Sequence, residues 1–389
     1  MLKKKIIINI EKSYIELDWI MPVLEKLKDN YEIITLFKNK KEIENLKKNK
    51  FLFHTLEKIS SKYFTYNLFD KVLIFFFGII DKLNLKFKFF NFIFHPKNIF
   101  FSKGIGYEQI KYFFTDFNSY SPILRLIGTN KQVGPKIIRY PNSVYIFSKP
   151  KKDAKISYAL IGDLLLLNYI ADLEYWKLRI DEKKIKVVGT PKFEKYWIDK
   201  SKKYFNNFKS NKYILLAYSS RFNQGYDDIL LRKQLIDIMD TLIEFKDYKI
   251  IIKIHPRKNN KEYLNILKNY DKTRWEITEE HISSLLENAS LYLHDRNSST
   301  LIEGLALNKR CIEYWDPVKE INSIEIFIND ELNLNIKAHD KKDLKRYIHM
   351  GLEDKDNYIW QNQFKNYQDI IGDNIEPTIK SVKEIEKLN

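Results

Sequence analysis

The second half of the sequence places polar residues directly after apolar runs of the kind that form strands. One run, 249–254, ends at His255-Pro256-Arg257, and a second, 291–293, leads through a polar turn to Ser298-Ser299-Thr300. An imidazole, a guanidinium and a hydroxyl-rich helix N-terminus can all donate hydrogen bonds to phosphate oxygens. If both runs belong to one parallel sheet, these donors meet at its carboxyl edge. The spacing therefore predicts a site for a phosphate or a nucleotide.

Each of these features also has a purely structural explanation. Asn297 or Ser298 is a good helix N-cap, and Glu303 stands near the capping-box position, so the helix needs no ligand. Proline cannot continue a central strand, because it has no backbone N–H to donate. Pro256 alone therefore explains why the chain turns after His255. We favour a ligand because the features occur together. Glu303, one turn inside the helix, can also accept hydrogen bonds from ribose hydroxyls.

A third polar segment, Ser219-Ser220-Arg221, follows the apolar run 213–218. We predict that it contacts a bound phosphate across a cleft, and the alternative is an ordinary polar turn between a strand and a helix. The complete set of expected donor-binding residues is Ser219, Ser220, Arg221, His255, Arg257, Asn297, Ser298, Ser299, Thr300 and Glu303.

The elements that would position these residues alternate between strand and helix. In the second half the expected strands are 213–218, 248–254, 275–277, 291–293 and 310–314, and the expected helices are 227–246, 260–269, 281–289 and 298–307. In the first half we expect strands at 4–10, 31–37, 111–115 and 184–188, with a helix at 164–178. Such alternation is typical of doubly wound α/β domains. The Phe-rich segment 63–101 is expected to form buried helix and strand, or alternatively a membrane-facing patch.

The 389 residues exceed what one ordinary core accommodates, so we expect two domains. The predicted boundaries are 1–198 for an acceptor-binding domain and 210–340 for a nucleotide-donor domain. The Lys-rich stretch 199–212 is the expected linker. Residues 341–389 are expected to form helices that pack back toward the first domain.

Composition limits the choice of partner and compartment. The formal net charge of +16 indicates an anionic partner, or alternatively a compositional bias of the genome. One cysteine, Cys311, excludes an intrachain disulfide and is expected to be a small core residue. The N-terminus lacks the long apolar stretch of a signal peptide, and the apolar run 72–80 is too short to span a membrane. We therefore expect a cytoplasmic protein.

The motifs at 187–197, 214–222, 253–257 and 294–315 resemble those of bacterial GT-B glycosyltransferases of surface-polysaccharide assembly. The similar group includes the HP-motif transferases that use CMP-linked acidic sugars and, more distantly, CDP-glycerol polymerases. The resemblance implies an α/β fold of two Rossmann-like doubly wound domains that face a cleft. It also implies that His255, Ser298 and Ser299 bind the nucleotide phosphate and that Glu303 contacts the ribose.

A GT-B enzyme carries its catalytic base on the first domain. The candidates are Glu11 and Glu16, after the first strand, and Asp116, after the run 111–115. Each can also be a solvated carboxylate of a loop or a helix start. His255 would stabilise the departing phosphate. No acidic pair is placed to hold a metal ion beside a diphosphate, so we expect a metal-independent mechanism with no cofactor besides the nucleotide-sugar co-substrate.

These observations predict a glycosyltransferase that moves a sugar from a nucleotide donor, first choice a CMP-linked nonulosonic acid or Kdo, to a glycan of the capsule or lipopolysaccharide. The acceptor is expected to be a glycan or a lipid-linked glycan, reached by peripheral contact with the inner membrane. One alternative keeps the fold: a CDP-glycerol-type glycerophosphotransferase or a sugar-nucleotide epimerase. A basic nucleic-acid-binding protein is the alternative of a different class. The dispersed lysines and the lack of a nucleic-acid motif argue against nucleic acid as a partner.

Overall fold

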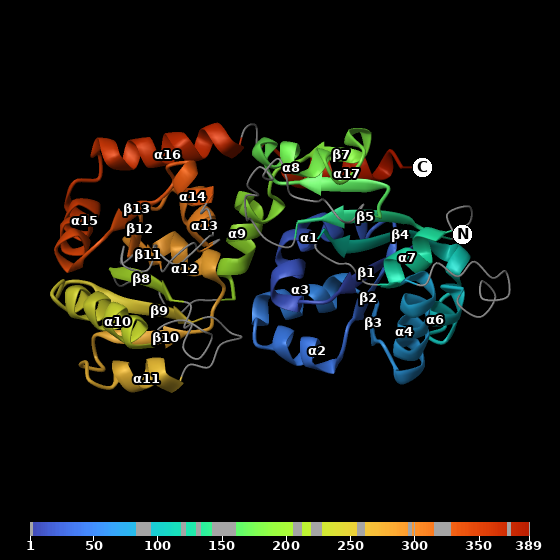
Figure 1. Ribbon diagram of the computed structural model, residues 1–389, viewed down its shortest axis with the longest axis horizontal. Helices are drawn as coiled ribbons and strands as arrows, with labels where there is room; N and C mark the ends of the chain where they lie inside the picture. Colours follow the sequence, from blue (N-terminus) through green and yellow to red (C-terminus); the bar gives the residue numbers. More distant parts are fainter. Residues whose placement is uncertain are drawn as a thin grey trace. The chain divides into compact units, whose positions relative to one another are not determined.

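The computed structural model describes residues 3–82, 95–117, 122–129, 134–141, 161–204, 212–218, 228–254, 261–294, 298, 300–314, 328–371 and 375–388. These residues form two units (Figure 1). The first unit comprises the described residues up to 141 together with 161–194 and 375–388, and the second comprises those of 195–371. Each unit is built around its own parallel sheet.

The first unit holds a seven-stranded sheet in the order β3-β2-β1-β4-β5-β6-β7. Its strands are β1 (Lys5–Ile10), β2 (Glu32–Phe37), β3 (Lys62–Thr65), β4 (Ile110–Asp116), β5 (Lys136–Tyr140), β6 (Leu164–Leu167) and β7 (Ile185–Val187). Its helices are α1 (Ser13–Leu27), α2 (Lys40–Lys47), α3 (Lys50–Ile59), α4 (Leu68–Lys82), α6 (Lys97–Phe101), α7 (Pro122–Thr129), α8 (Leu173–Lys177) and α17 (Pro377–Glu386), with 3-10 turns at Tyr107–Gln109, Ile170–Asp172, Glu182–Lys184 and Pro191–Phe193. Continuous β-branched runs such as that of β1 suit strands buried on both faces. The strand order reverses between β1 and β4, which is where open α/β sheets bind ligands.

The second unit repeats this plan with six strands in the order β10-β9-β8-β11-β12-β13. The strands are β8 (Tyr213–Tyr218), β9 (Lys249–Ile254), β10 (Trp275–Thr278), β11 (Leu291–His294), β12 (Cys311–Tyr314) and β13 (Ile336–Ala338). The helices are α9 (Lys195–Lys202), α10 (Asp228–Ile243), α11 (Lys261–Leu267), α12 (Ile282–Asn288), α13 (Thr300–Ala306), α14 (Ile328–Glu331), α15 (Lys341–Glu353) and α16 (Tyr358–Ile371). The order reverses between β8 and β11. The prediction of two parallel α/β sheets is therefore confirmed.

Several local expectations differ from the structure. The helix expected at 164–178 is wrong, because Leu164–Leu167 forms the buried strand β6 and only Leu173–Lys177 is an α-helix. A short apolar run has no periodicity that separates a buried strand from a buried helix. The strands β3 and β13, four and three residues long, were not expected.

The C-terminal helices divide between the two units. We expected residues 341–389 as a whole to return to the first domain, but α15 and α16 belong to the second unit and only 375–388 belong to the first. Leu344, Ile348 and Trp360 explain this division, since all three are buried in the apolar core of the second sheet. In the first unit α17 packs against α1.

The Phe-rich segment 63–101 is only partly buried. Within α4, Leu73 joins the core of the first unit, but Phe75 and Phe76 are exposed. Residues 83–94 of this segment lie outside the described residues. None of the helices that the structure describes combines the length and apolarity needed to cross a membrane.

Cys311 is a core residue, as expected. It is fully buried in β12, its Sγ donates to the backbone oxygen of Lys309 at 3.1 Å, and burial raises the pKa of its thiol. A Cβ atom added to Gly304 of α13 would approach this Sγ to 2.6 Å. Glycine therefore allows α13 to pack closely on β12.

Candidate functional site

Glu16 closes the loop between β1 and α1. The carboxylate of this buried residue accepts hydrogen bonds from the backbone N–H groups of Glu11 and Lys12, each at 2.8 Å. The next N–H group, that of Ser13, donates to Glu42 of α2 at 2.9 Å. Because side-chain carboxylates take these N–H groups, the start of α1 has no need of a bound anion.

Asp116 ends β4 close to Glu16, so that its charge and a side-chain hydrogen bond both act on the pKa of the Glu16 carboxyl group. Two carboxyl groups can form such a bond only when one of them carries a proton. Burial, followed by the charge of Asp116, raises the pKa of Glu16 well above its ordinary value. At the point where the strand order of the first sheet reverses, Glu16 therefore keeps its proton to a higher pH than an ordinary carboxyl group.

The third predicted base, Glu11, belongs to the same cluster. Its charge also raises the pKa of Glu16, and together with Glu16 and Asp116 it raises the pKa of Tyr140, although burial is the larger cause for both groups. The structure thus brings together all three carboxyl groups that the sequence nominated from separate segments.

Tyr140 ends β5 next to the carboxyl pair, and sequence reasoning missed it. Its ring is fully buried and stacks with Trp19 at a centroid distance of 6.0 Å. Among the described residues, no group hydrogen-bonds to its hydroxyl. Buried hydroxyls normally have a partner, so this one is available to a ligand or a water molecule. Its place at the end of an apolar strand was the signal that the sequence offered.

Arg139, the residue before Tyr140, fixes the backbone that follows Asp116. The guanidinium is buried and donates to the carbonyl of Phe117 at 2.9 Å and to that of Ile161 at 3.3 Å. The backbone N–H of Phe117 donates in turn to the carbonyl of Tyr140 at 2.9 Å. These bonds hold the end of β4, and therefore Asp116, in place.

The raised pKa of Glu16 predicts a specific pH dependence of stability. The folded state binds the proton more tightly than the unfolded state, so this contribution is complete below the ordinary carboxyl pKa and is lost as the pH rises through the folded pKa. Glu16→Gln removes the titration. We expect the advantage of wild type over this variant to shrink with rising pH by up to about 1.4 kcal/mol per pH unit within that window. Urea unfolding at a series of pH values measures it.

The variant Glu57→Gln, which replaces an exposed carboxylate of α3, is the control for this experiment. Glu16→Gln also disturbs the two backbone hydrogen bonds, but that cost does not vary with pH. A difference between wild type and Glu16→Gln that stays constant from acid to alkaline pH would contradict the raised pKa of Glu16.

In the second sheet, three strands end just before the residues that the sequence predicted to bind the nucleotide donor. β8 ends at Tyr218 and β9 at Ile254, each one residue before a predicted polar segment, and β11 ends at His294, three residues before Asn297. These strands are neighbours in the order β9-β8-β11. Most of the predicted residues themselves lie outside the described residues, namely Ser219, Ser220, Arg221, His255, Arg257, Asn297 and Ser299, and their roles stay predictions.

In the turn at 298–300, the two described residues, Ser298 and Thr300, hydrogen-bond to each other in the way expected of a capped helix start. The Ser298 Oγ lies 2.6 Å from the Thr300 Oγ1 and accepts from the Thr300 backbone N–H at 3.3 Å. The hydroxyl of Tyr292 forms a further hydrogen bond with Thr300. Both side chains therefore already have partners at the start of α13.

Glu303 is buried and lies toward α12 and β9. Its carboxylate accepts from the Ser283 Oγ at 3.5 Å, and its charge acts on Lys253. Burial lowers the pKa of Lys253 to about 8, against the opposing attraction of the nearby glutamates, and the ammonium donates to the carbonyl of Glu279 at 2.8 Å. A bound anion here would favour the charged form of this lysine.

A polar row crosses the second sheet at this edge, and sequence reasoning missed it. The register aligns Lys253, Ala217, His294 and Glu313 on four adjacent strands. The Nδ1 of buried His294 lies 3.8 Å from the Oε2 of buried Glu313. The signal in the sequence was a polar residue within each of three otherwise apolar strands.

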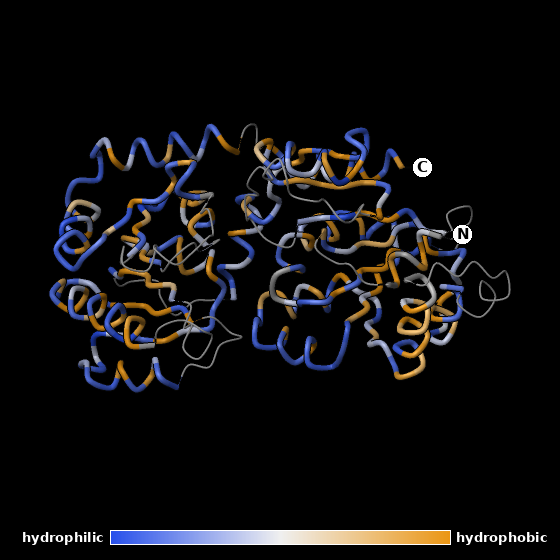
Figure 2. The backbone as a smooth tube through the Cα atoms, viewed as in Figure 1, coloured by the Kyte–Doolittle hydropathy of each residue, from blue (hydrophilic) through white to orange (hydrophobic). Residues whose placement is uncertain are grey.

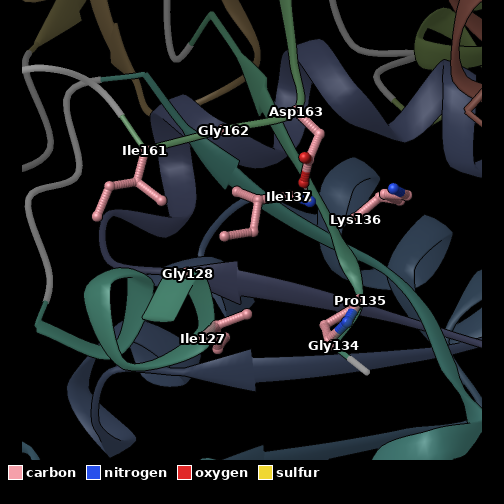
Figure 3. Close-up of a pocket in the computed structure, with 9 residues that line it drawn as sticks. All are labelled: Ile127, Gly128, Gly134, Pro135, Lys136, Ile137, Ile161, Gly162 and Asp163. Atoms are coloured by element: carbon pink, nitrogen blue, oxygen red, sulfur yellow. Dashed lines mark hydrogen bonds between the residues drawn. The ribbon is translucent and has the colours of Figure 1, made fainter. Parts of the chain in front are cut away.

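A small cavity lies at the other edge of the first sheet (Figure 3). It has a volume of about 110 Å³, and Ile127, Lys136, Ile137 and Asp163 are among its lining residues. The Asp163 carboxylate accepts from the backbone N–H of Ile137 at 2.8 Å. Because β5 begins at Lys136 and ends at Tyr140, this cavity is distinct from the carboxyl cluster.

Within the part of the chain that the structure describes, no group of three or more His, Cys, Asp or Glu residues is placed to hold a metal ion. The metal-independent mechanism stays a prediction.

The fold places the chain in a structural class. Two Rossmann-like units in one chain, each with the strand order of a doubly wound nucleotide-binding sheet, define the GT-B fold. No protein-family model and no curated protein sequence matches the chain.

Solved structures with the same fold are similar over nearly the whole chain. The UDP-GlcNAc 2-epimerase of Methanocaldococcus jannaschii, in complex with UDP-GlcNAc and UDP, is 18% identical with a TM-score of 0.60 and full coverage of both chains. MnaA of S. aureus, solved with UDP, is 13% identical with a TM-score of 0.62 and covers 99% of this chain and 96% of its own. The wall teichoic acid polymerase TagF is 13% identical with a TM-score of 0.60, covering 99% and 88%. At sequence identities this low, the structural similarity shows that these proteins share a fold with the chain.

Proposed function

We propose that the protein is an enzyme that acts on a nucleotide-linked sugar and transfers a proton through Asp116. The single observation that carries this proposal is the buried pair of Glu16 and Asp116, in which the pKa of Glu16 is raised, at the edge where the strand order of the first sheet reverses. Buried carboxyl groups with raised pKa values are typical of acid–base catalysts. Asp116 is the group that meets the substrate. Glu16 is a positioning residue that stores the proton.

Epimerisation is the reaction that we favour. One way to invert the carbon beside the anomeric centre is by proton transfer. A base would remove its proton while the C–H electron pair forms a double bond and expels the nucleoside diphosphate. The diphosphate would then add back as a proton reaches the opposite face, with no net oxidation. Asp116 would remove the proton, and Glu11 provides the second carboxyl group that such an inversion requires. Epimerases of UDP-GlcNAc are among the structures similar to this chain over its full length, which supports the same choice.

A transfer reaction is the second candidate. The polymerase TagF shares the fold, and its structure was solved with CDPG. The net charge of +16 suits an anionic acceptor, and a transferase needs only one base, for which Asp116 suffices. The CMP-linked acidic-sugar transferase expected from the sequence motifs remains the third candidate and has no further support.

The nucleotide is assigned to the second unit in each case. Polar segments begin at the ends of three adjacent strands there, and Lys253 adds a cation at the same edge. We propose that His255, Ser298 and Ser299 hold the phosphates. A bound phosphate would raise the pKa of Lys253 and so hold it in the charged form.

Product analysis separates the three candidates. The full-length protein is incubated in deuterium oxide with UDP-GlcNAc, with CDP-glycerol and with a CMP-linked acidic sugar, each with and without a glycan or glycerol-phosphate acceptor. Epimerisation gives the 2-epimer with solvent deuterium at the inverted carbon. Phosphotransfer releases CMP and forms a phosphodiester, and glycosyl transfer releases CMP and forms a glycoside.

We expect deuterium incorporation with UDP-GlcNAc, detected by proton NMR. Release of CMP without incorporation would overturn the epimerase assignment in favour of transfer. Neither exchange nor release with any of the three substrates, together with no thermal stabilisation by UDP, CDP or CMP, would overturn the proposed enzyme activity.

A further inference from the structure

One side of α4 presents large apolar side chains to solvent. Leu68, Phe69, Val72, Phe75, Phe76 and Ile79 are all exposed, with 78% of Leu68 and 64% of Phe75 accessible. Their spacing of three to four residues places them in one stripe along the helix. We call this stripe the α4 face, and Figure 2 shows the strongly apolar colouring of α4.

The opposite side of α4 is fixed to the first unit, so the α4 face has a defined orientation. Leu73 is buried in the core, and Ile74 and Phe77 pack against it. Asp70 is fully buried in an ion pair with Lys103, and its carboxylate also accepts from the backbone N–H of Asn67 at 2.8 Å. A helix that is apolar on all sides normally lies inside a protein or against lipid.

The exposed charges beside the first turn of the α4 face are positive. From residue 60 to the end of α4 the charged residues are Lys62, Asp70, Lys71, Asp81 and Lys82. Lys62 and Lys71 are exposed, whereas Asp70 is buried with Lys103. Exposed cations beside an apolar stripe match the surface of an anionic bilayer, and the whole chain has a formal net charge of +16.

We propose that the α4 face docks the protein onto an anionic lipid bilayer. The helix of 15 residues is about 22 Å long and lies in the plane of the membrane interface, since it is too short to span the hydrocarbon core. Its Phe and Leu side chains enter the boundary of the acyl chains, and Lys71 stays at the level of the headgroups. This surface function does not depend on the reaction proposed above.

Vesicle sedimentation with the full-length protein tests the proposal. Vesicles of phosphatidylcholine, with and without phosphatidylglycerol, are mixed with wild type and with the double variant Leu68→Ser/Phe75→Ser. The matched control is Ile229→Ser/Ile236→Ser, which removes two exposed apolar side chains from α10 of the second unit. Because all four side chains are exposed, neither variant is expected to unfold the protein, and thermal unfolding verifies this.

We expect wild type and the α10 control to bind anionic vesicles equally. The α4 variant should bind more weakly by about tenfold for each side chain removed. Lys71→Gln should weaken binding to anionic vesicles by about fivefold and leave the weak binding to neutral vesicles unchanged.

Three results would overturn the proposal. Equal binding of the α4 variant and the control would place the lipid contact elsewhere. A dimer of wild type that the α4 variant abolishes, without vesicle binding, would mean that a second copy covers the α4 face. Hydrogen-exchange protection of residues 68–79 that is the same with and without anionic vesicles would mean that lipid does not cover them.

Discussion

Asp116→Asn is expected to lower turnover by about 100- to 10,000-fold on whichever nucleotide-linked substrate the enzyme accepts, with little change in KM. The amide cannot take a proton from the substrate, but it can donate a hydrogen bond to Glu16 and so preserve the packing. Steady-state kinetics measures the effect. The exposed Asp29→Asn, in the turn after α1, is the matched control and should be fully active.

A second readout distinguishes a catalytic role of Asp116 from a structural one. Its charge helps to raise the pKa of Glu16, so the uncharged asparagine should let that pKa fall. The loss of stability with rising pH that Glu16 causes should then be smaller in Asp116→Asn and should end at a lower pH. Turnover within a few-fold of wild type in this variant would remove the carboxyl pair from the mechanism, even if its titration were confirmed.

Lys103→Met is expected to reduce the free energy of unfolding by about 3–5 kcal/mol. The ammonium of Lys103 and the carboxylate of Asp70 form an ion pair whose side chains are 5% and 0% exposed. The Asp70 carboxylate would lose this partner, and its Oδ1 has no hydrogen-bond partner among the described residues. Urea or thermal unfolding of the full-length protein measures the loss.

The double variant Asp70→Asn/Lys103→Met should recover much of this stability, because the neutral amide can still accept from Asn67. Lys47→Met, which breaks the exposed ion pair with Glu44, should leave the unfolding midpoint unchanged. If Lys103→Met were no more destabilising than Lys47→Met, the buried pair would not hold α4 in place.

The sequence predicted the architecture because its strands are long apolar runs separated by amphipathic helices. The runs at 4–10, 31–37, 213–218 and 248–254 all form central or adjacent strands of the two sheets. The sequence does not identify Leu164–Leu167 as a strand, because a run of four leucines has neither the periodicity of a helix nor that of a strand. Ile336–Ala338 is too short, at three residues, to show any hydrophobic periodicity. Only packing against neighbouring strands identifies such segments.

The candidate site was less accessible to sequence reasoning. Position after a strand was enough to nominate Glu11, Glu16 and Asp116, since parallel strands deliver their ends to one edge. The interaction between the Glu16 and Asp116 carboxyl groups joins residues 100 positions apart, and no local pattern encodes it. Tyr140 and the row of Lys253, His294 and Glu313 were missed for the same reason, because their significance arises from strand register.

The buried state of Cys311 has a practical consequence for spectroscopy. It is the single cysteine of the chain, and burial both hides its thiol and disfavours the reactive thiolate. A cysteine introduced at an exposed position, such as Phe76→Cys, would therefore be the thiol that maleimide dyes modify, with no need to remove the native one. An environment-sensitive fluorophore attached there would report the polarity around the helix in real time.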